Sequence, residues 1–395
     1  MILTREPGRG WRPAPRRPRV IPRESSASPV TGTPLPVFDG HNDTLLRLFR
    51  RGGDAPERAF LDGEAAGHID LPKARQGGLA GGLFAIFSPS EGGGAKVEEM
   101  MASPPYDVPL ADYLDLTFAQ RVTLHMAALL FRIERASGGS VRVCRRADEL
   151  RGSIDAGVLA TVLHIEGADT IDPDFHFLDV LYEAGLRSLG IVWSRPTIFA
   201  HGVPFRFPSG PDTGPGLTDL GRALVRRCNE RRIMLDLSHL NEKGFWDVAK
   251  LSDAPLVATH SNAHAITPHS RNLTDKQLKA VRETGGLVGV NFATSFIRAD
   301  GRKDADTSLD EVIRHFDHLI EHVGEDGVGF GSDFDGATVP EPIGDAAGLP
   351  RLIEAMRRHG YGEALLRKLS HENWIGVLAR TWGAAPAEAE AGLAA

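Results

Sequence analysis

The stretch Val37-Phe38-Asp39-Gly40-His41-Asn42-Asp43 joins a short apolar run to a group of polar residues, and this arrangement recurs along the chain. The apolar run predicts a buried strand over Val37–Gly40. His41 and Asp43 are two positions apart, so they project to the same side of an extended segment. An imidazole nitrogen and a carboxylate oxygen placed in this way can bind one metal ion together, and both suit Zn2+.

Short apolar runs alternate with longer helical patterns from Pro36 onward. Such alternation indicates parallel βα units and hence an α/β fold, and eight such units in one chain fit a (β/α)8 TIM-type barrel better than an open sheet. Thr218 and Thr274 precede two helical patterns and are predicted N-caps. The predicted strands are Val37–Gly40, Leu79–Phe87, Ala160–Ile165, Ser188–Trp193, Ile233–Ser238, Pro255–Thr259, Gly286–Asn291 and Val328–Gly331. The predicted helices are Ala111–Ala136, Asp174–Ala184, Thr218–Arg231, Thr274–Glu283 and Ser308–His322.

Two long segments, Ser88–Pro109 and Arg195–Pro215, follow predicted strands and are rich in Gly and Pro. In a (β/α)8 barrel, the segments that follow the strands lie at the C-terminal mouth, where active sites are built. Long loops at such a position usually shape a substrate pocket. We therefore expect both segments to border the site.

Residues that can bind metals follow five of the eight predicted strands. Because the C-terminal ends of barrel strands meet on one face, these side chains should converge. His41 and Asp43 would bind one metal ion, and a second would be bound by His239 and His260. Glu166 would give one carboxylate oxygen to each ion, with the two ions roughly 3.5–4 Å apart.

Two ions bridged in this way predict hydrolytic chemistry, because a water held between them loses a proton near neutral pH and becomes a nucleophile. Asp333, which follows the last predicted strand, is well placed to carry a proton. A single His-X-Asp pair arises by chance, and one histidine after a strand is more often a structural residue. Five such strand ends in one chain favour the metal site.

The remaining histidines have simpler interpretations. His164 precedes Glu166 by two positions and should share its side of the strand, either as a core residue, which we favour, or as a partner behind the metal ligands. The histidines predicted to lie on the surface or at helix caps are His264, His269, His315, His318, His322 and His371.

The composition is that of an ordinary globular chain, with 42% hydrophobic residues, 25% charged residues and a net charge of -7. This charge gives no general affinity for nucleic acid, and no apolar run of about 18 residues predicts a membrane helix. Cys144 and Cys228 make no disulfide framework and fit a reducing, cytoplasmic compartment. We expect a small-molecule substrate, no nucleic-acid or membrane partner, and a chain that is compatible with a homodimer.

The two ends of the chain differ from the middle. Residues 1–36 carry seven Arg and two Glu among many Pro, and they predict a disordered leader without the apolar core of a secretion signal. We expect the metallohydrolase barrel domain over 37–385 and a flexible Ala- and Glu-rich tail over 386–395.

Five short motifs carry the polar residues described above. They are DGHND (Asp39–Asp43), the IEG around Glu166, DLSH (Asp236–His239), ATHSNAHAITPHSRNLTD (Ala258–Asp275) and GSDFDG (Gly331–Gly336). In this order and spacing they resemble the membrane (renal) dipeptidase family, peptidase family M19. The resemblance covers the chain from about Val37 to about Leu378.

The resemblance implies a (β/α)8 barrel that binds two Zn2+ per chain and hydrolyses the amide bond of dipeptides or similar short amides by a metal-bound hydroxide. It implies that Arg271 binds the substrate carboxylate and that Asp333 handles the proton. Without the family, Arg271 would be interpreted as a solvated loop cation. The implied ligands are His41, Asp43 and Glu166 for one zinc, and Glu166, His239 and His260 for the other.

Two features depart from the family. Its animal members have a secretion signal, a disulfide and a lipid anchor, and this sequence predicts none of them, which is typical of a bacterial, soluble member. The family usually has a histidine after the fourth strand that helps to bind the developing oxyanion, and Trp193 stands at that position. Tryptophan donates one N–H but cannot be cationic. His201, in the following loop, is a candidate substitute donor, and Trp193 is alternatively a packing residue.

Two other functions stay open. A barrel amidohydrolase would act on a lactone, a cyclic amide or an N-acyl amino acid. Such enzymes often carry His-X-His after strand one and a carbamylated lysine as bridge, whereas this chain has His-X-Asp and no predicted strand that ends in lysine. The second alternative, made conceivable by Trp193, is a catalytically weakened binding homologue.

Overall fold

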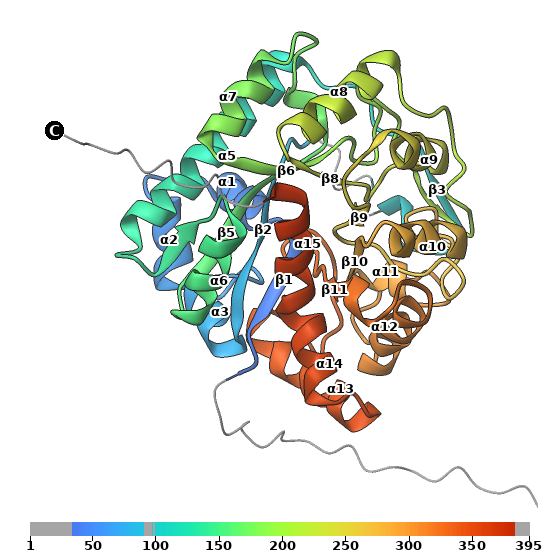
Figure 1. Cartoon of the computed structure of the whole chain (residues 1–395). Coiled ribbons are helices and arrows are strands. Elements are labelled where there is room, and N and C mark those ends of the chain that lie inside the picture. The colour runs from blue at the N-terminus through green and yellow to red at the C-terminus, as the bar shows by residue number, and fades with distance from the viewer. Residues whose placement is uncertain (1–33, 91–96, 98, 384–395) are drawn as a thin grey trace, which may run out of the picture. The chain divides into compact units, whose positions relative to one another are not determined.

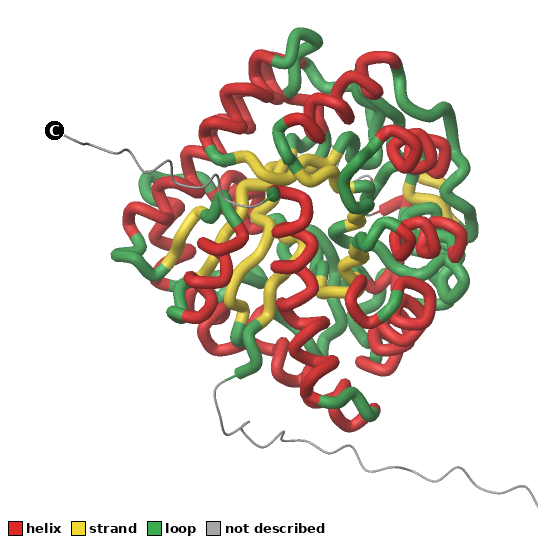
Figure 2. Tube along the Cα trace, viewed as in Figure 1, coloured by secondary structure: helices red, strands yellow, loops and turns green. Residues whose placement is uncertain are grey.

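Eight parallel strands close into a barrel (Figures 1 and 2). The order in the sheet is β2-β1-β11-β10-β9-β8-β6-β5, and β5 pairs back to β2 over seven residue pairs, which closes the ring. The chain is therefore a (β/α)8 TIM-type barrel, as the sequence predicts. The barrel strands are β1 (Val37–Asn42), β2 (Leu79–Phe87), β5 (Leu159–Glu166), β6 (Leu186–Gly190), β8 (Met234–Asp236), β9 (Val257–Ala258), β10 (Leu287–Val290) and β11 (Val328–Phe330).

This computed structural model describes residues 34–90, 97 and 99–383. The flexible tail predicted over 386–395 lies outside the described residues, as does nearly all of the leader predicted over 1–36. Part of the predicted loop 88–109 also lies outside them. None of the helices within the described ranges is long and apolar enough to cross a membrane.

Strand boundaries differ from the predicted ones where polar residues continue a strand. β1 extends to Asn42, which pairs with Phe84, and β5 extends to Glu166, which pairs with Phe87. An apolar run in the sequence indicates only the part of a strand whose side chains face the core. The backbone hydrogen bonds of the strand continue for as long as the neighbouring strand runs beside it. In contrast, β6 ends at Gly190, so that Trp193 lies in the connection beyond it rather than in the strand.

Helices surround the barrel (Figure 2). The five predicted helices are present as α5 (Leu116–Ala136), α7 (His176–Ala184), α8 (Asp219–Glu230), α10 (Asp275–Glu283) and α12 (Leu309–Val323). Both predicted N-caps are confirmed, because Thr218 accepts a hydrogen bond from the Gly221 N–H, and Thr274 forms a capping box with Gln277. Helices that were not predicted are α1 (Thr44–Arg51), α2 (Pro56–Asp62), α3 (Leu71–Gly77), α6 (Ala147–Asp155), α9 (Glu242–Leu251), α11 (Thr294–Ile297), α13 (Leu349–His359), α14 (Glu363–Arg367) and α15 (Asn373–Trp382).

One end of the barrel is filled by apolar side chains and closed by α15, which lies across it in Figure 1. Trp374 of α15 is fully buried, and its indole N–H donates to the carbonyl of Phe330 over 2.9 Å. Phe38 packs against the same indole, with ring centroids 6.0 Å apart. The polar residues described below lie toward the opposite, C-terminal end of the strands.

The two predicted long loops pair with each other. β3 (Tyr106–Val108) and β7 (Phe205–Phe207) form a two-stranded antiparallel sheet, with Tyr106 opposite Phe207. Both strands pack into a small apolar cluster with Phe296. Each strand has only three residues, too few to show a period of two in the sequence. A further short strand, β4 (Val141–Val143), extends the main sheet outside β5.

Candidate active site

A cavity of about 250 Å3 lies at the C-terminal ends of the strands. The polar part of its lining includes Asp43, Glu166, His239 and Asp333, together with Arg50, Ser90, Ser295, Lys303, Asp335 and Thr338. The apolar part comes largely from the two long loops and from α11, as the sequence predicts for the loops. The apolar lining residues include Phe87, Pro89, Val97, Met101, Trp193, Phe205 and Phe296.

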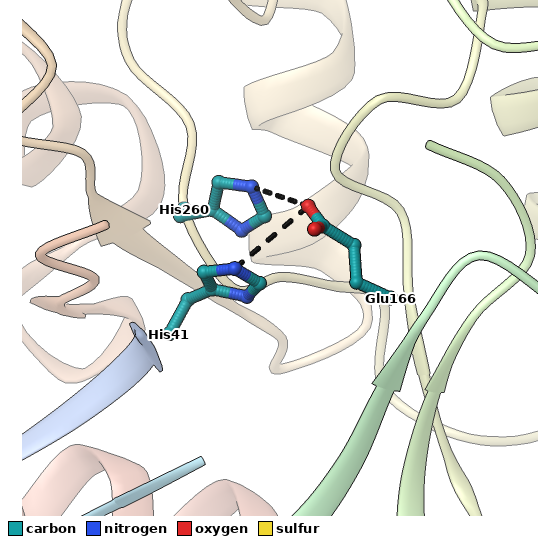
Figure 3. A group of neighbouring side chains, drawn as sticks. All are labelled: His41, Glu166 and His260. Atoms are coloured by element: carbon teal, nitrogen blue, oxygen red, sulfur yellow. Dashed lines mark ion pairs between the residues drawn. The ribbon is translucent and has the colours of Figure 1, made fainter. Parts of the chain in front are cut away.

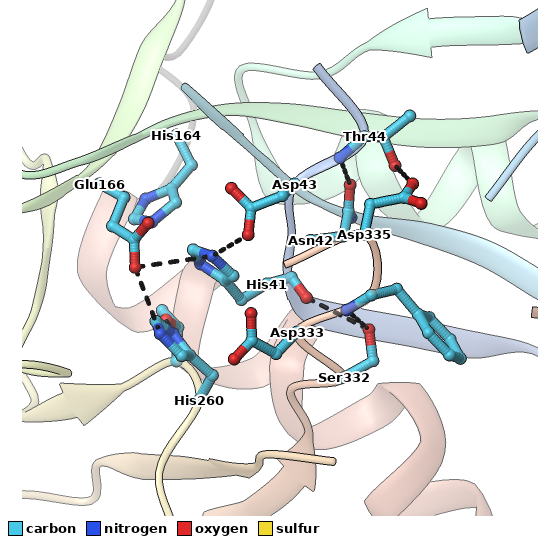
Figure 4. A network of polar contacts seen from close by, with 12 residues as sticks. His41, Asn42, Asp43, Thr44, His164, Glu166, His260, Ser332, Asp333 and Asp335 are labelled. Carbon is cyan, nitrogen blue, oxygen red and sulfur yellow. Dashed lines mark hydrogen bonds and ion pairs between the residues drawn. The ribbon is translucent and has the colours of Figure 1, made fainter. Parts of the chain in front are cut away.

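His41, Asp43 and Glu166 form the first group of predicted ligands (Figure 4). The Nε2 atom of His41 lies 3.6 Å from Oδ2 of Asp43 and 3.8 Å from Oε1 of Glu166. All three residues are buried, and His41 stacks on the ring of His260 at a centroid distance of 3.9 Å. A Cβ on Gly336 would lie 2.1 Å from Oδ2 of Asp43, so only glycine lets the loop after β11 approach this carboxylate.

Glu166, His239 and His260 form the second group. Oε1 of Glu166 lies 3.0 Å from Nε2 of His239 and 3.4 Å from Nε2 of His260. Figure 3 shows His41 and His260 turned toward this one carboxylate oxygen. Glu166 thus stands between the two groups, as expected of a carboxylate that gives an oxygen to each of two ions.

The donor atoms of the first group fit a bound cation. Both ring nitrogens of His41 and the Oδ1 atom of Asp43 are buried without a hydrogen-bond partner. Buried polar atoms of this kind cost free energy unless something satisfies them. Imidazole nitrogen and carboxylate oxygen are the donor set of zinc sites, so these residues fit the metal that the sequence predicts.

Hydrogen bonds behind His260 fix its tautomer. The Thr259 hydroxyl lies 2.6 Å from Oδ2 of Asp236 and donates its proton there. The same hydroxyl lies 2.8 Å from Nδ1 of His260, and with its own proton committed it accepts the Nδ1–H. The Nε2 atom of His260 therefore carries a lone pair directed at the site. His239 is oriented in a similar way, because its Nδ1 lies 2.9 Å from the hydroxyl of Ser194.

Several of these positioning residues were not assigned from the sequence. Asp236 and Thr259 orient His260, Ser194 orients His239, and Asp39 accepts hydrogen bonds from the backbone and hydroxyl of Ser332. Their signal is their position, since each lies within three residues of a predicted strand end or a predicted ligand. The sequence pattern alone does not distinguish short polar residues that orient ligands from polar residues of ordinary loops.

The charges of the site shift the pKa values of its metal-free groups. Burial lowers the pKa of His41, but the carboxylates of Glu166, Asp43 and Asp333 outweigh it and raise that pKa to about 10. Burial holds the pKa values of His239 and His260 well below the usual value. These two rings are neutral at physiological pH and can offer lone pairs to a cation.

Asp333 lies beside the first group and lines the cavity. Its Oδ2 accepts a hydrogen bond of 3.0 Å from the Asn291 side chain. Burial raises the pKa of Asp333, which favours a carboxyl that can hold a proton. Its φ of +59°, like the +67° of His239, lies in the left-handed region that non-glycine residues rarely occupy, and such strain clusters at functional sites.

Arg271 is fully inside the protein, which excludes the solvated loop cation. It is 3% exposed, and one guanidinium N–H donates to the His260 carbonyl over 3.1 Å. Its Nε has no hydrogen-bond partner. Its guanidinium lies over the ring of Phe296, 5.5 Å from the centroid. Phe296 lines the cavity, whereas Arg271, like His41 and His260, is not among the described residues that line it. Burial lowers the pKa of Arg271 to about 10, so it remains cationic at neutral pH.

Trp193 lines the cavity, whereas His201 is not among the described residues that line it. The indole packs on Phe87 and Phe205, with ring centroids 4.9 and 5.5 Å away. Arg195, which was not predicted from the sequence to be a site residue, is completely buried beside Trp193. Its guanidinium lies 5.1 Å from the centroid of the indole ring, and its nitrogens have no hydrogen-bond partner.

Three other histidines are buried. His164 lies in the barrel interior, where its Nδ1 is 2.8 Å from the Ser188 hydroxyl, as the favoured core interpretation expects. His269 and His315 were predicted to be exposed, and this prediction is wrong, because each has 0% exposure. His315 lies on the face of α12 that packs on the barrel and bonds to the Ile297 carbonyl.

Comparison with known proteins agrees with this geometry. The sequence profile of membrane dipeptidase (peptidase family M19) matches residues 28–390. Among proteins with curated sequences, the chain is 49% identical over 255 residues to the Klebsiella pneumoniae "uncharacterized protein in pqqA 5′ region", covering 65% of this chain and 94% of the relative.

Two solved structures share the whole barrel. The structure of dipeptidase AC, a metallo peptidase of family M19, has a TM-score of 0.86 and 58% identity, over 89% of this chain and 99% of that chain. A metallo peptidase from Rhodobacter sphaeroides, liganded with a phosphinate mimic of the dipeptide L-Ala-D-Ala, has a TM-score of 0.87 and 57% identity, over 88% of this chain and 100% of that chain. The chain therefore belongs to the membrane dipeptidase family of metallopeptidases, peptidase family M19.

Proposed function

We propose that this protein is a zinc-dependent dipeptidase that binds two Zn2+ per chain. The observation that carries the proposal is the position of Glu166, whose Oε1 lies within 3.0 to 3.8 Å of the Nε2 atoms of three histidines. A carboxylate in the centre of three imidazoles is suited to bridge two cations.

His41, Asp43 and Glu166 would hold one ion, and Glu166, His239 and His260 the other. When bound, a pair of such ions activates a water as nucleophile and polarises the carbonyl of the scissile bond. Glu166 would keep the two positive charges close together. The Asp236–Thr259 pair would keep the Nε2 lone pair of His260 aimed at the site.

The substrate would be positioned by groups around this centre. Arg271 would pair with the free carboxylate of a short peptide, because it is a buried cation with an unpartnered Nε–H. Asp333 would take a proton from the nucleophilic water and give it to the leaving amine, and its raised pKa supports that role. Trp193, which lines the cavity, would contact the substrate.

The substrate class we propose is a dipeptide with small side chains, including dipeptides whose C-terminal residue has the D configuration. The Rhodobacter sphaeroides relative was solved with a mimic of L-Ala-D-Ala, and the cavity of about 250 Å3 is small. Apolar walls from Phe87, Trp193 and Phe205 favour uncharged side chains.

One observation favours a second candidate function. The position where the family usually has an oxyanion-binding histidine holds Trp193, and the described residues that line the cavity do not include His201. A site with one fewer cationic donor suits another short amide, or a lactone, processed by the same metal centre. If the missing donor abolishes most of the catalysis, the protein would instead be a homologue that binds such compounds without cleaving them.

The test is a hydrolysis panel with the purified, zinc-loaded chain. L-Ala-L-Ala, L-Ala-D-Ala, their C-terminal amides and an N-acetyl amino acid would be compared by release of free amine. We expect cleavage of the two free dipeptides, and none by a Glu166→Gln variant. A protein that contains two zinc ions yet cleaves only the N-acetyl substrate would support the amidohydrolase, and one that cleaves nothing but binds dipeptides would support the binding homologue.

A further inference from the structure

A second group of metal-binding side chains lies on the outer helices and shares no residue with the active-site cavity. His318 and His322 lie on α12, and Asp275 is the first residue of α10. The two helices pack side by side (Figure 1). One donor atom from each of these three residues lies within 4.8 Å of the other two.

The two histidines project from the same face of α12, because residues four positions apart on an α-helix are neighbours. Their ring centroids are 4.2 Å apart, and the rings are inclined by 32°. Across the helix interface, Oδ1 of Asp275 lies 2.8 Å from Nε2 of His318. An Asp–His pair on the surface is common and contributes little by itself. The imidazole of His322, one helical turn after His318, adds a third potential ligand to this pair.

The chemistry of the three donors selects a class of ion. Two imidazole nitrogens and one carboxylate oxygen suit Zn2+, Ni2+ or Cu2+, whereas Ca2+ and Mg2+ prefer sites made of oxygen alone. Three protein ligands leave a coordination position for water. The side chains can rotate to bring their donors around an ion, because Asp275 is 48% exposed and His318 is 18% exposed.

The open position would face a broad surface groove of about 670 Å3 that Asp275 and His322 border. Lys276, Lys279 and Arg282 of α10 border the same groove together with Glu283 and Glu321, and Lys279 pairs with Glu283 at 3.8 Å. Asp275, Glu283 and Glu321 balance these three cations, so the lower affinity that we expect, compared with the buried carboxylate-rich centre, follows from the exposure of the site to solvent, which screens its charges.

We propose that Asp275, His318 and His322 form a further, solvent-exposed site for one divalent ion of the zinc class, and that the ion links α10 to α12. The site is distinct from the active centre and does not depend on the proposed dipeptidase function. An ion that binds only the folded chain stabilises it in proportion to the logarithm of the ion concentration.

Zinc binding to the untagged full-length chain tests the proposal, after the buried centre has been saturated and loose metal removed. Isothermal titration with Zn2+ would compare the wild type with His318→Gln, His322→Gln and Asp275→Asn. His359→Gln is the matched control, because His359 forms a similar exposed pair with Asp317 at 2.9 Å but has no second histidine one turn away. We expect the wild type and the control to bind one more Zn2+ than His322→Gln, or to bind it at least roughly tenfold more tightly.

Thermal unfolding provides the second measurement. Added Zn2+ should raise the Tm of the wild type and of His359→Gln more than that of the three site variants, and the dipeptidase activity of all five proteins should stay the same. Equal zinc uptake and equal Tm shifts in the wild type and in His318→Gln and His322→Gln would overturn the proposal. Loss of the extra ion in the His359→Gln control would do so as well.

Discussion

The Nε2 atoms of His239 and His260 lie 3.1 Å apart, and both face the same oxygen of Glu166. Burial holds the pKa of each ring well below the usual value, so neither ring is cationic at neutral pH. The Nε2 of His260 carries a lone pair. Burial raises the pKa of Glu166 to about 8, so near neutral pH this carboxyl holds a proton that a bound cation would displace. Electron-rich atoms held this close repel one another unless a cation lies between them, so this contact favours a bound metal ion.

The folded chain should bind about two zinc ions, as two-metal hydrolases do. Glu166→Gln should weaken both sites, because this carboxylate approaches the donors of both groups. His239→Ala should weaken mainly one. Mass spectrometry of the native protein and metal analysis after dialysis would measure this. A single ion per chain, unaffected by changes at His239 or His260, would contradict the bridged centre.

Metal uptake should release protons. In the metal-free protein His41 carries a proton up to a pKa of about 10, since Glu166, Asp43 and Asp333 outweigh its burial. A bound ion replaces this proton, so the apparent zinc affinity should fall as the pH falls below about 10, by about tenfold per pH unit for each proton displaced. Titrations of metal-free protein in buffers of different ionisation enthalpy would count the protons. The His239→Ala variant is the control, because His239 is neutral and should not change the count for the remaining ion. Zinc binding without proton release at neutral pH would contradict the charge state of His41.

Whether a site residue can be predicted from the sequence depends on whether its position follows from the local pattern or from contacts with residues distant in the sequence. The sequence predicts His41, Glu166, His239 and His260 because each lies within a few residues of the end of an apolar run, and barrel topology brings such positions together. Arg271 has no such signal, since it lies in an irregular segment and is buried by contacts such as that with Phe296. The family resemblance singled it out, and local pattern alone would have left it on the surface.

Other differences have physical causes of the same kind. His315 follows Val312 by three positions on α12 and lies on the buried face of that helix. Helical periodicity alone therefore predicts that His315 is buried. Arg195 and Trp374 have no such signal, because their burial depends on partners distant in sequence. The indole N–H of Trp374, for example, donates a hydrogen bond to the carbonyl of Phe330, which lies 44 residues earlier in the chain.

Arg271 should restrict the enzyme to substrates with a free carboxylate close to the scissile bond. A guanidinium can bind a carboxylate through two parallel hydrogen bonds, which an ammonium cannot reproduce. Arg271→Lys should therefore lower kcat/KM for dipeptides by roughly tenfold or more, as expected for a lost charge-assisted hydrogen bond. Tripeptides and C-terminally amidated dipeptides should be poor substrates of the wild type. Equal cleavage of the amides and the free acids would rule out this role for Arg271.

Asp333→Asn should keep the metal content and nearly abolish turnover. An amide is similar in size to a carboxylate and can keep the contact with Asn291, but it cannot carry a proton. General acid–base groups typically contribute about 100-fold to 10,000-fold, and kcat should fall by an amount in that range. Metal analysis of the same preparation is the control. Loss of zinc together with activity would instead identify Asp333 as a ligand of the ion at His41 and Asp43.

The last prediction concerns Trp193, which narrows the cavity and supplies at most one neutral N–H to a developing oxyanion. A donor aimed at that charge is typically worth about 2.7–4 kcal/mol, so its absence should slow the hydrolysis of ordinary L,L-dipeptides. Trp193→His should raise turnover of these substrates without changing the zinc content. The smaller ring also loses packing against Phe87 and the contact with the Arg195 guanidinium, so the Tm should fall. His201→Ala tests the substitute donor predicted from the sequence: a fall in kcat would support that role, and an unchanged kcat would exclude it. Rapid wild-type hydrolysis of L,L-dipeptides that Trp193→His leaves unimproved would show that this site functions without a histidine at that position.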